Sequence, residues 1–198
     1  MERDIILASA SPRRRELLQR MGLSFRVQAD PTDETADAAA APWELVQQLA
    51  EKKARNVAAQ QNGPALVIGA DTVVVLDGRV LGKPHDAAEA AEMLGALSGR
   101  THSVFTGYFV LDTADGKYAG GYEKTEVTFR PLTQEEIEAY LRTGEPMDKA
   151  GAYGIQEYGA LFVERIAGDY FNVVGLPVCK LGQILTAEFG VSLLPDGR

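Results

Sequence analysis

The chain has 198 residues, of which 45% are hydrophobic and 24% are charged, and its formal net charge is −8. This composition is typical of a soluble globular protein with one domain or two closely joined lobes, and the acidic balance argues against a broad nucleic-acid surface. The apolar runs are too short for a membrane span or a signal peptide, so we expect neither.

The first predicted strand, residues 5–8, leads directly into the sequence ASASPRRREL. Ser11 suits the N-cap of a helix, and Pro12 suits its first position. The free backbone N–H groups of such a helix, the serine hydroxyls and the arginines at 13–15 together favour a phosphate group. The alternative is a well-capped surface helix whose arginines are merely solvated, and this stretch alone supports both interpretations about equally.

The stretch 30–41 is acidic and poor in large apolar side chains, which is typical of a solvated loop. A helix is predicted to begin at Pro42, to run to about residue 60 and to end at Asn62-Gly63. Lys53 falls within the apolar stripe of this helix. A lysine at such a position either extends its ammonium group to solvent or points into a polar site, and the spacing alone leaves both open.

Residues 66–68 and 73–76 are strongly strand-forming, and Asp77-Gly78 suits a two-residue hairpin turn. The sequence GADT, residues 69–72, separates the two runs and carries Asp71. An ionised carboxylate in an apolar stretch needs a cation, hydrogen-bond donors or a metal. We therefore favour a functional carboxylate over an ordinary loop turn at this point.

Capping residues and apolar periodicity predict the remaining elements. Asp86 and Thr133 each precede a glutamate by three residues, which is the pattern of a capping box at the start of a helix. The further elements are helices 86–97, 133–143 and 178–189 and a strand pair, 104–111 and 118–129. Because two hairpins exclude a purely parallel sheet, the predicted fold class is α/β, with a mixed sheet and flanking helices.

A glycine-rich sequence, DKAGAYGIQEYGA at 148–160, allows a ligand to approach the backbone closely. The side-chain amide of Gln156 offers a donor group and an acceptor, as the edge of a nucleobase requires. A purely structural glycine-rich loop fits the composition equally well. Lys83, in the short sequence GKP, is by itself a weak signal for a ligand site.

Several familiar catalytic motifs are missing from the sequence. The two histidines, His85 and His102, form no zinc-binding pair, and the chain has neither a P-loop nor a G-x-S-x-G elbow. These absences argue against a histidine zinc site, a P-loop enzyme and a serine hydrolase. The cationic side chains and carboxylates that remain suit an anionic ligand with Mg²⁺ or Mn²⁺.

The single cysteine, Cys179, excludes an internal disulfide and suits a reducing compartment, so we expect a cytoplasmic location. No histidine lies near Cys179 in the sequence to activate its thiol. We therefore expect this side chain to be packed rather than reactive.

Seven strings, taken in order, resemble the Maf family of nucleoside triphosphate pyrophosphatases and span nearly the whole chain. They are LASASPRRREL, LAEKKA, IGADTVV, LGKPHDAAEAAEML, LSGRTHSVFTG, DKAGAYGIQ and VVGLPV. The resemblance implies one domain, 1–198, with two lobes around one active-site cleft, similar in architecture to inosine triphosphate pyrophosphatases. It further implies hydrolysis of a nucleoside triphosphate to the monophosphate and pyrophosphate with a divalent metal cation, and it suggests a homodimer.

The resemblance also implies roles for individual residues. Asp71 matches the catalytic base and, together with Glu34, the metal-binding carboxylates, with Asp33 and Asp37 as alternatives to Glu34. The residues that match phosphate-binding positions are Ser9, Arg14, Lys53 and Lys83. The residues that match base-discriminating positions are Arg13, Thr72 and Gln156.

Arg13 together with Gln156 resembles the subfamily that acts on dTTP and UTP, and modified pyrimidine nucleotides are further candidate substrates. One alternative is the sister subfamily, which prefers N7-methylated GTP. Another is a nucleotide-binding regulator of cell division without turnover. Retention of both Asp71 and Glu34 argues against the regulator, because a pure binder needs neither a metal nor a base.

Overall fold

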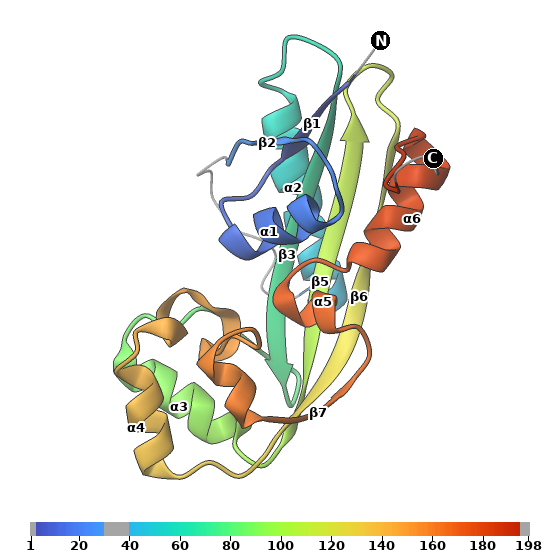
Figure 1. Cartoon of the computed structure of the whole chain (residues 1–198). Coiled ribbons are helices and arrows are strands. Elements are labelled where there is room, and N and C mark those ends of the chain that lie inside the picture. The colour runs from blue at the N-terminus through green and yellow to red at the C-terminus, as the bar shows by residue number, and fades with distance from the viewer. Residues whose placement is uncertain (1–2, 30–39, 195–198) are drawn as a thin grey trace. The chain divides into compact units, whose positions relative to one another are not determined.

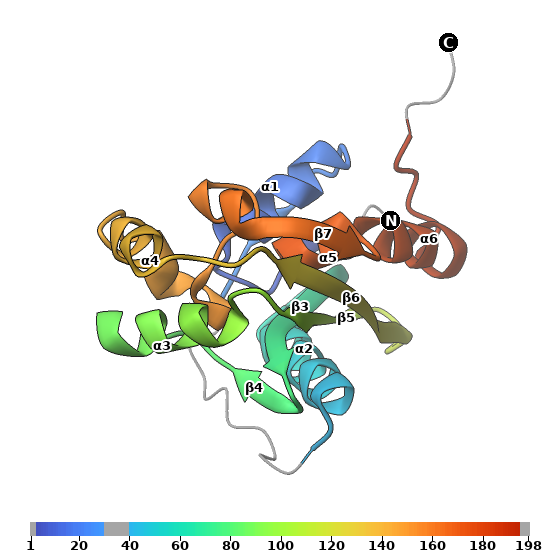
Figure 2. The ribbon, with the colours of Figure 1, turned by 90° about the horizontal axis from the view of Figure 1, so that it is seen from below.

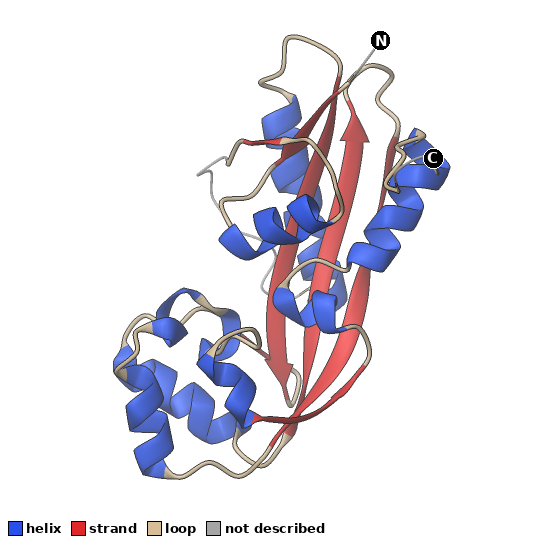
Figure 3. Ribbon diagram, viewed as in Figure 1, coloured by secondary structure: helices blue, strands red, loops and turns tan. Residues whose placement is uncertain are grey.

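A computed structural model describes residues 3–29 and 40–194 of the chain, which form an α/β fold. Helices and strands alternate along much of the chain (Figure 3). The chain divides into two compact units, which are described separately. Unit 1 comprises Met1–Asp71, Thr106–Glu123 and Gly175–Arg198, and unit 2 comprises Thr72–Phe105 and Lys124–Val174.

Among the described residues, the two longest helices lie in unit 1 and the short 3₁₀ segments lie in unit 2. Unit 1 contains β1 (Asp4–Leu7), α1 (Pro12–Arg20), β2 (Arg26–Val27), α2 (Pro42–Ala58) and α6 (Val178–Phe189). Unit 2 contains β4 (Arg79–Leu81), α3 (Ala87–Leu97), α4 (Gln134–Leu141), η1 (Glu145–Asp148), η2 (Ala150–Ala152), η3 (Tyr158–Phe162), β7 (Val163–Ala167) and α5 (Tyr170–Val174). Three strands contribute residues to both units: β3 (Ala65–Leu76), β5 (Thr101–Asp112) and β6 (Tyr118–Phe129).

The strands form one mixed sheet of seven, in the order β2-β1-β3-β5-β6-β7, with β4 paired to β3. β1 is parallel to both β2 and β3, whereas β4 is antiparallel to β3 and β7 is antiparallel to β6. The two-residue turn between β3 and β4 has positive φ at both Asp77 and Gly78, as a type I′ hairpin turn requires. The predicted mixed α/β class and this hairpin are therefore confirmed.

In unit 1, α2 covers one face of β1 and β3, and α1 lies on the opposite face (Figures 1 and 2). The core between α2 and the strands consists of small and β-branched side chains with two larger ones from β5. Its buried members are Ile6, Ala8, Ala50, Ala54, Val57, Ala65, Val67, Phe109 and Leu111. The alanines of α2 let the helix backbone approach the sheet closely.

In unit 2, α3 and α4 pack against each other (Figure 2). Aromatic rings fill much of the buried interior of this unit, and most of them meet edge to face, which is a favoured geometry for aromatic pairs. Phe129 contacts the rings of His102, Tyr153 and Phe162 in this way, and Tyr140 contacts Phe162. Tyr153 belongs to the glycine-rich segment 148–160, so this aromatic cluster anchors that segment in the unit.

Most predicted elements are present, and the helix 178–189 and the strand 118–129 have the predicted ends. The capping box at Thr133 is confirmed. At Asp86 only half of it forms, because the Glu89 carboxylate accepts from the backbone N–H of His85 instead. Helix α2 ends at Ala58, slightly earlier than expected.

One expectation was wrong. Cys179 is exposed on α6 and not packed, because it lies outside the buried stripe formed by Leu181, Leu185 and Phe189. The two strand runs around GADT belong to one continuous strand, β3, so Asp71 lies within a strand and the loop turn that was disfavoured at this point is absent. Neither the short strands β2 and β7 nor the five-residue helix α5 was predicted. Among the residues that the structure describes, no helix has both the length and the apolar character to cross a bilayer.

Candidate active site

The position of Asp71 follows from the alternation of side chains along β3. Val67, Gly69 and Asp71 point to the same face of the sheet, the face that α2 covers. A Cβ atom at Gly69 would lie 2.1 Å from the backbone oxygen of Ala50 and 3.0 Å from the Cβ of Ala54. Gly69 is therefore required for the contact between α2 and β3, two positions before Asp71.

Gly107 on the neighbouring strand β5 serves the same contact. A Cβ atom there would lie 2.2 Å from the backbone oxygen of Val46, one turn earlier on α2. Two glycines on adjacent strands thus let the helix lie directly on the sheet backbone. This role was not predicted, although a glycine inside an apolar strand run is a recognised signal for close backbone approach.

The closely packed helix brings Lys53 to Asp71. Lys53 shares its helix face with Ala50, Ala54 and Val57, at the spacing of successive turns. Its Nζ donates to Oδ1 of Asp71 at 2.5 Å, and the two side chains are only 19% and 13% exposed. The ammonium group therefore points to a polar partner and not to solvent, and it offsets the burial of the carboxylate charge.

The N-terminus of α1 has the predicted cap. The Ser11 side chain accepts from the backbone N–H of Arg14, and Pro12 occupies the first position of the helix. Ser9 Oγ accepts from the backbone N–H of Ser11 at 3.2 Å. The serine hydroxyls thus shape the turn between β1 and α1 and leave the helix N-terminus at the carboxyl end of a parallel strand, where anionic ligands commonly bind.

Arg14 differs from its neighbours on the same turn, because it is only 8% exposed whereas Arg15 is exposed and Arg13 is half-buried. Its Nη1 donates to Ser9 Oγ at 3.1 Å and its Nε to the backbone oxygen of Gly175 at 2.8 Å. The interpretation of these arginines as a merely solvated face is therefore wrong for Arg14. A role for Ser9, Arg13 and Arg14 at a phosphate stays a prediction.

Parallel pairing relates the two parts of the unit 1 site. Leu7 is in register with Ile68, and the backbone N–H of Ala8 donates to the backbone oxygen of Ile68 at 2.8 Å. Ser9 and Asp71 therefore follow the paired segments of β1 and β3 in the same direction along the sheet. Unit 1 thus contains a carboxylate–ammonium pair and a capped helix N-terminus beyond the same paired segments.

Unit 2 contains the other predicted residues, Thr72, Lys83 and Gln156. Thr72 is half-buried in β3 directly after Asp71, and Lys83 is exposed in the segment that follows β4. Gln156 is half-buried. The base-discriminating roles of Thr72 and Gln156 and the phosphate role of Lys83 stay predictions.

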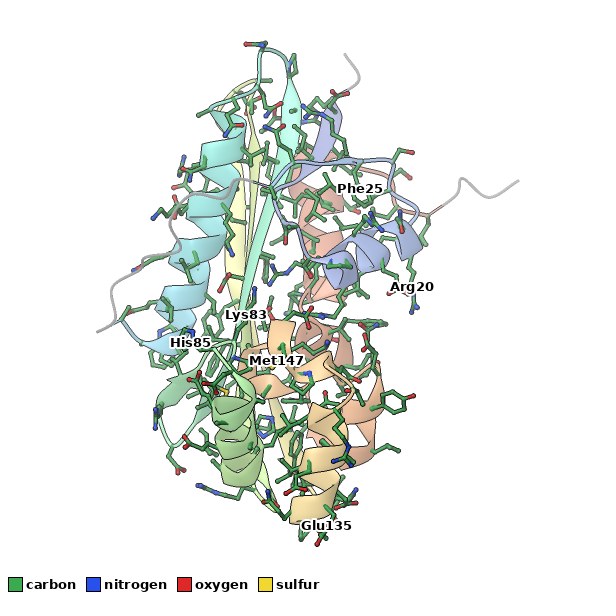
Figure 4. The ribbon with its side chains drawn as sticks, turned by 90° about the vertical axis from the view of Figure 1, so that its left-hand side faces the viewer. Arg20, Phe25, Lys83, His85, Glu135 and Met147 are labelled. Atoms are coloured by element: carbon green, nitrogen blue, oxygen red, sulfur yellow. The ribbon has the colours of Figure 1, made fainter. Side chains whose placement is uncertain are left out.

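The structure joins the segment of Lys83 to the glycine-rich segment. The backbone N–H of Gly151 donates to the backbone oxygen of Gly82 at 3.0 Å, and a Cβ at Gly151 would lie 3.0 Å from the side chain of Val74. In Figure 4, Lys83 and Met147 lie in the same region of unit 2, in agreement with this hydrogen bond. Unit 2 therefore brings two of its three predicted segments together.

Metal ligation was predicted for Asp71 and Glu34, and Glu34 lies outside the described residues, as do Asp33 and Asp37. Within the described ranges, no group of three or more His, Cys, Asp or Glu side chains could hold a metal ion. Mg²⁺ is commonly held by one or two carboxylates together with phosphate oxygens of the substrate and water. The single partly exposed carboxylate of Asp71 fits that kind of site, and a protein-only cage of three or more carboxylates does not fit the described residues.

The fold and these side chains define a class, an α/β protein whose first unit offers a half-buried carboxylate–ammonium pair and a helix N-terminus suited to an anion. The family is shown by sequence: the family model described as "Maf-like protein" matches residues 4–188, so the chain belongs to the Maf family. The fold is similar to that of a HAM1 protein from Coxiella burnetii, with a TM-score of 0.51 and 20% identity over 93% of this chain and 99% of that chain.

Curated relatives match nearly the whole length of the chain. A protein of Moorella thermoacetica is 56% identical over 189 residues, covering 96% of each chain. One of Bacillus pumilus is 53% identical and covers 95% of this chain and 97% of its own, and one of Alkaliphilus metalliredigens is 50% identical and covers 98% and 100%. Each of the three carries the name dTTP/UTP pyrophosphatase.

Proposed function

We propose that this protein hydrolyses dTTP and UTP to the nucleoside monophosphate and pyrophosphate. The observation that carries the proposal is the Lys53–Asp71 pair, which holds a potential base beside a cation within a closely packed helix–strand contact. Relatives at 50% to 56% identity over nearly the full length are named for this activity. Modified pyrimidine nucleotides are further candidate substrates of the same site.

In the proposed reaction, Asp71 accepts a proton from the water that attacks the α-phosphorus. The bond from the α-phosphorus to its bridging oxygen breaks, and pyrophosphate leaves. A carboxylate base of this kind typically contributes about 10²- to 10⁴-fold to the rate. Lys53 has two anionic partners in this scheme, the carboxylate of Asp71 before substrate binds and a phosphate oxygen afterwards.

Charge neutralisation is assigned to groups of both units. Arg13, the N-terminus of α1 and Ser9 would hold phosphate oxygens, and Arg14 contributes through the Ser9 hydroxyl that it already contacts. Lys83 is exposed and adds a further cation. Stabilising negative charge on the leaving pyrophosphate is the largest task of such a site.

Asp71 and Glu34 are the carboxylates that would hold a divalent cation, Mg²⁺ or Mn²⁺. When bound, this cation would lower the pKa of the attacking water and neutralise phosphate charge. Asp71 alone among these residues is described by the structure, and it is partly exposed beside Lys53. Both the metal requirement and its identity belong to the proposal.

Base selection is assigned to Arg13, Thr72 and Gln156. The amide of Gln156 can donate to and accept from the edge of a pyrimidine. A site that hydrogen-bonds its preferred base rejects others, because its own polar groups are then left unpaired.

The proposal also includes a homodimer, which the family resemblance favours, and a cytoplasmic location, which the lone cysteine favours. It includes no nucleic-acid partner, in keeping with the net charge of −8.

The proposal is tested by measuring pyrophosphate release from dTTP, UTP, CTP, dGTP and N7-methyl-GTP, each with Mg²⁺, with Mn²⁺ and with EDTA. We expect metal-dependent release with the highest kcat/KM for dTTP and UTP. Preference for N7-methyl-GTP would keep the chemistry and overturn the base assignment. Tight nucleotide binding without release of pyrophosphate would instead favour a regulator.

A further inference from the structure

The carboxylate of Glu145, at the start of η1, is buried in unit 2 and accepts three hydrogen bonds. Oε1 accepts from the hydroxyl of Tyr140 at 2.7 Å and from the backbone N–H of Gly159 at 3.2 Å. Oε2 accepts from the backbone N–H of Tyr158 at 3.0 Å. A buried carboxylate needs such donors, and here two of the three are backbone amides just after Gln156.

The hydroxyl of Tyr140 reaches the same loop from its other side. It accepts from the backbone N–H of Gly154 at 3.2 Å while it donates to Glu145. Burial, together with the hydrogen bond to Glu145, raises the pKa of Tyr140 far above its ordinary value, so the hydroxyl keeps the proton that it donates. Tyr140 and Glu145 therefore hold the backbone on both sides of Gln156.

Two glycines, Gly154 and Gly159, allow the two ends of the segment 154–159 to lie close together. A Cβ atom at Gly159 would lie 2.6 Å from the backbone oxygen of Gly154 and 2.9 Å from the Tyr140 hydroxyl. A Cβ atom at Gly154 would lie 2.5 Å from Cε of Lys149. The two ends of the segment 154–159 are thus in close backbone contact, and Gln156 lies between them.

The buried side chain of Lys149 contacts both Glu145 and Gly154 and so stabilises the same segment. It is 6% exposed, and its Nζ donates to the backbone oxygen of Glu145 at 2.7 Å and to Oδ1 of Asp148 at 2.8 Å. Its stem packs against Gly154. The residue that carries the buried carboxylate is therefore itself fixed by a neighbouring cation.

From this geometry we propose that Tyr140 and Glu145 are positioning residues for base selection, which set the orientation of the Gln156 amide by clamping the segment 154–159. The inference rests on the proposed function, in which Gln156 faces the base. A selective amide must present its donor and acceptor in one order, since a freely moving amide would satisfy purine and pyrimidine edges alike. A merely structural network would maintain the fold of unit 2 without affecting the choice of base.

The test compares Tyr140→Phe and Glu145→Gln with the wild type, with dTTP and dGTP as substrates. Tyr140→Phe keeps the ring that packs against Phe162 and removes only the hydroxyl. We expect the ratio of kcat/KM for dTTP over dGTP to fall by about tenfold, as for the loss of one hydrogen bond. The fall should come from a higher KM for dTTP, with kcat changed by less than about twofold, and Gln156→Ala should show the same pattern.

Ile137→Val is the matched control, because Ile137 is buried on α4 in the same unit and makes no hydrogen bond to the segment 154–159. It should lower the melting temperature without changing the ratio of kcat/KM. Folded clamp variants with the wild-type ratio would overturn the proposal. A ratio that falls equally in Ile137→Val would also overturn it, because instability alone would then explain the effect.

Amide hydrogen exchange of the segment 154–159 tests the clamp independently of activity. Exchange at Gly154, Tyr158 and Gly159 should be faster in Glu145→Gln than in the wild type, and unchanged exchange would contradict the clamp. If the wild type releases no pyrophosphate from any nucleotide, the proposed function fails. The clamp is then decided by this exchange and by the ratio of the Kd for dTTP to the Kd for dGTP, which must rise in the variants if the proposal holds.

Discussion

The Lys53–Asp71 pair in unit 1 and the loop around Gln156 in unit 2 are held in place by different means. Regular structure positions the pair, because α2 lies directly on the sheet at Gly69 and Gly107. A buried hydrogen-bonded carboxylate and two touching glycines position the loop. The first arrangement suits chemistry, which needs fixed distances, and the second suits selection of the base.

This difference predicts that a substitution in the Lys53–Asp71 pair lowers kcat and leaves the preference for the base unchanged. Asp71→Asn keeps the shape of the side chain and removes the base. We expect kcat to fall at least about 100-fold for dTTP and UTP alike. Steady-state kinetics with saturating metal measure this, and Asp115→Asn, in an exposed turn of the same unit, is the control.

Wild-type kcat in Asp71→Asn with a full metal complement would remove Asp71 from the chemistry. A changed ratio between dTTP and dGTP would instead show that the pair also takes part in selection, and the division between the two units would fail.

The contact between α2 and β3 can be broken without altering any polar group. In Gly69→Ala the added methyl group meets the backbone oxygen of Ala50, so the helix must shift. We expect a loss of about 3 kcal/mol of the free energy of unfolding, which lowers Tm by roughly 6 to 12 °C. Differential scanning calorimetry measures the change.

Gly63→Ala is the matched control, because nothing lies within 4 Å of a Cβ atom at Gly63. Its effect should stay within about 0.5 kcal/mol. Equal Tm values for Gly69→Ala and Gly63→Ala would show that the helix can shift freely and that the glycine does not fix the pair.

Unit 2 should respond to acid through His102. Burial lowers the pKa of His102 to about 4, against a smaller opposing effect of Glu126. Between about pH 6.5 and pH 4, His102 is protonated in the unfolded chain but neutral in the folded chain. The free energy of unfolding therefore falls as the pH falls through this window. The expected loss between pH 7 and pH 5 is about 2 kcal/mol.

Urea unfolding of the wild type, His102→Gln and His85→Gln at both pH values isolates this contribution. His102→Gln should lose less stability on acidification than the wild type, whereas His85→Gln, with the exposed histidine replaced, should behave as the wild type does. The same pH dependence in all three proteins would contradict a neutral buried His102.

The sequence predicts most of the fold because its signals are local. The N-cap at Ser11, the turn at Asp77-Gly78 and the periodicity of the helix 178–189 each depend on neighbouring residues, and each is confirmed. The strands β2 and β7 were missed, since a strand of two residues and one with little burial carry almost no pattern. Asp71 lies within a continuous strand, as the β-formers that follow it indicated, because a partner on α2 stabilises its carboxylate there.

The candidate site could be predicted only where one residue type is unusual for its place. A lysine on an apolar helix stripe and an aspartate among β-formers both indicated polar partners, and they are partners of each other. Glu145 and Tyr140 could not be predicted, because their role depends on amides of Gly154 and Gly159 that are remote in sequence. Whether the two units border one cleft stays a prediction.

The most direct test of the central claim is the fate of oxygen from the attacking water. Hydrolysis of dTTP in water enriched in ¹⁸O, followed by mass spectrometry of both products, shows which phosphorus is attacked. Attack at the α-phosphorus predicts the label in thymidine monophosphate and unlabelled pyrophosphate. Label in pyrophosphate or release of inorganic phosphate would contradict the account.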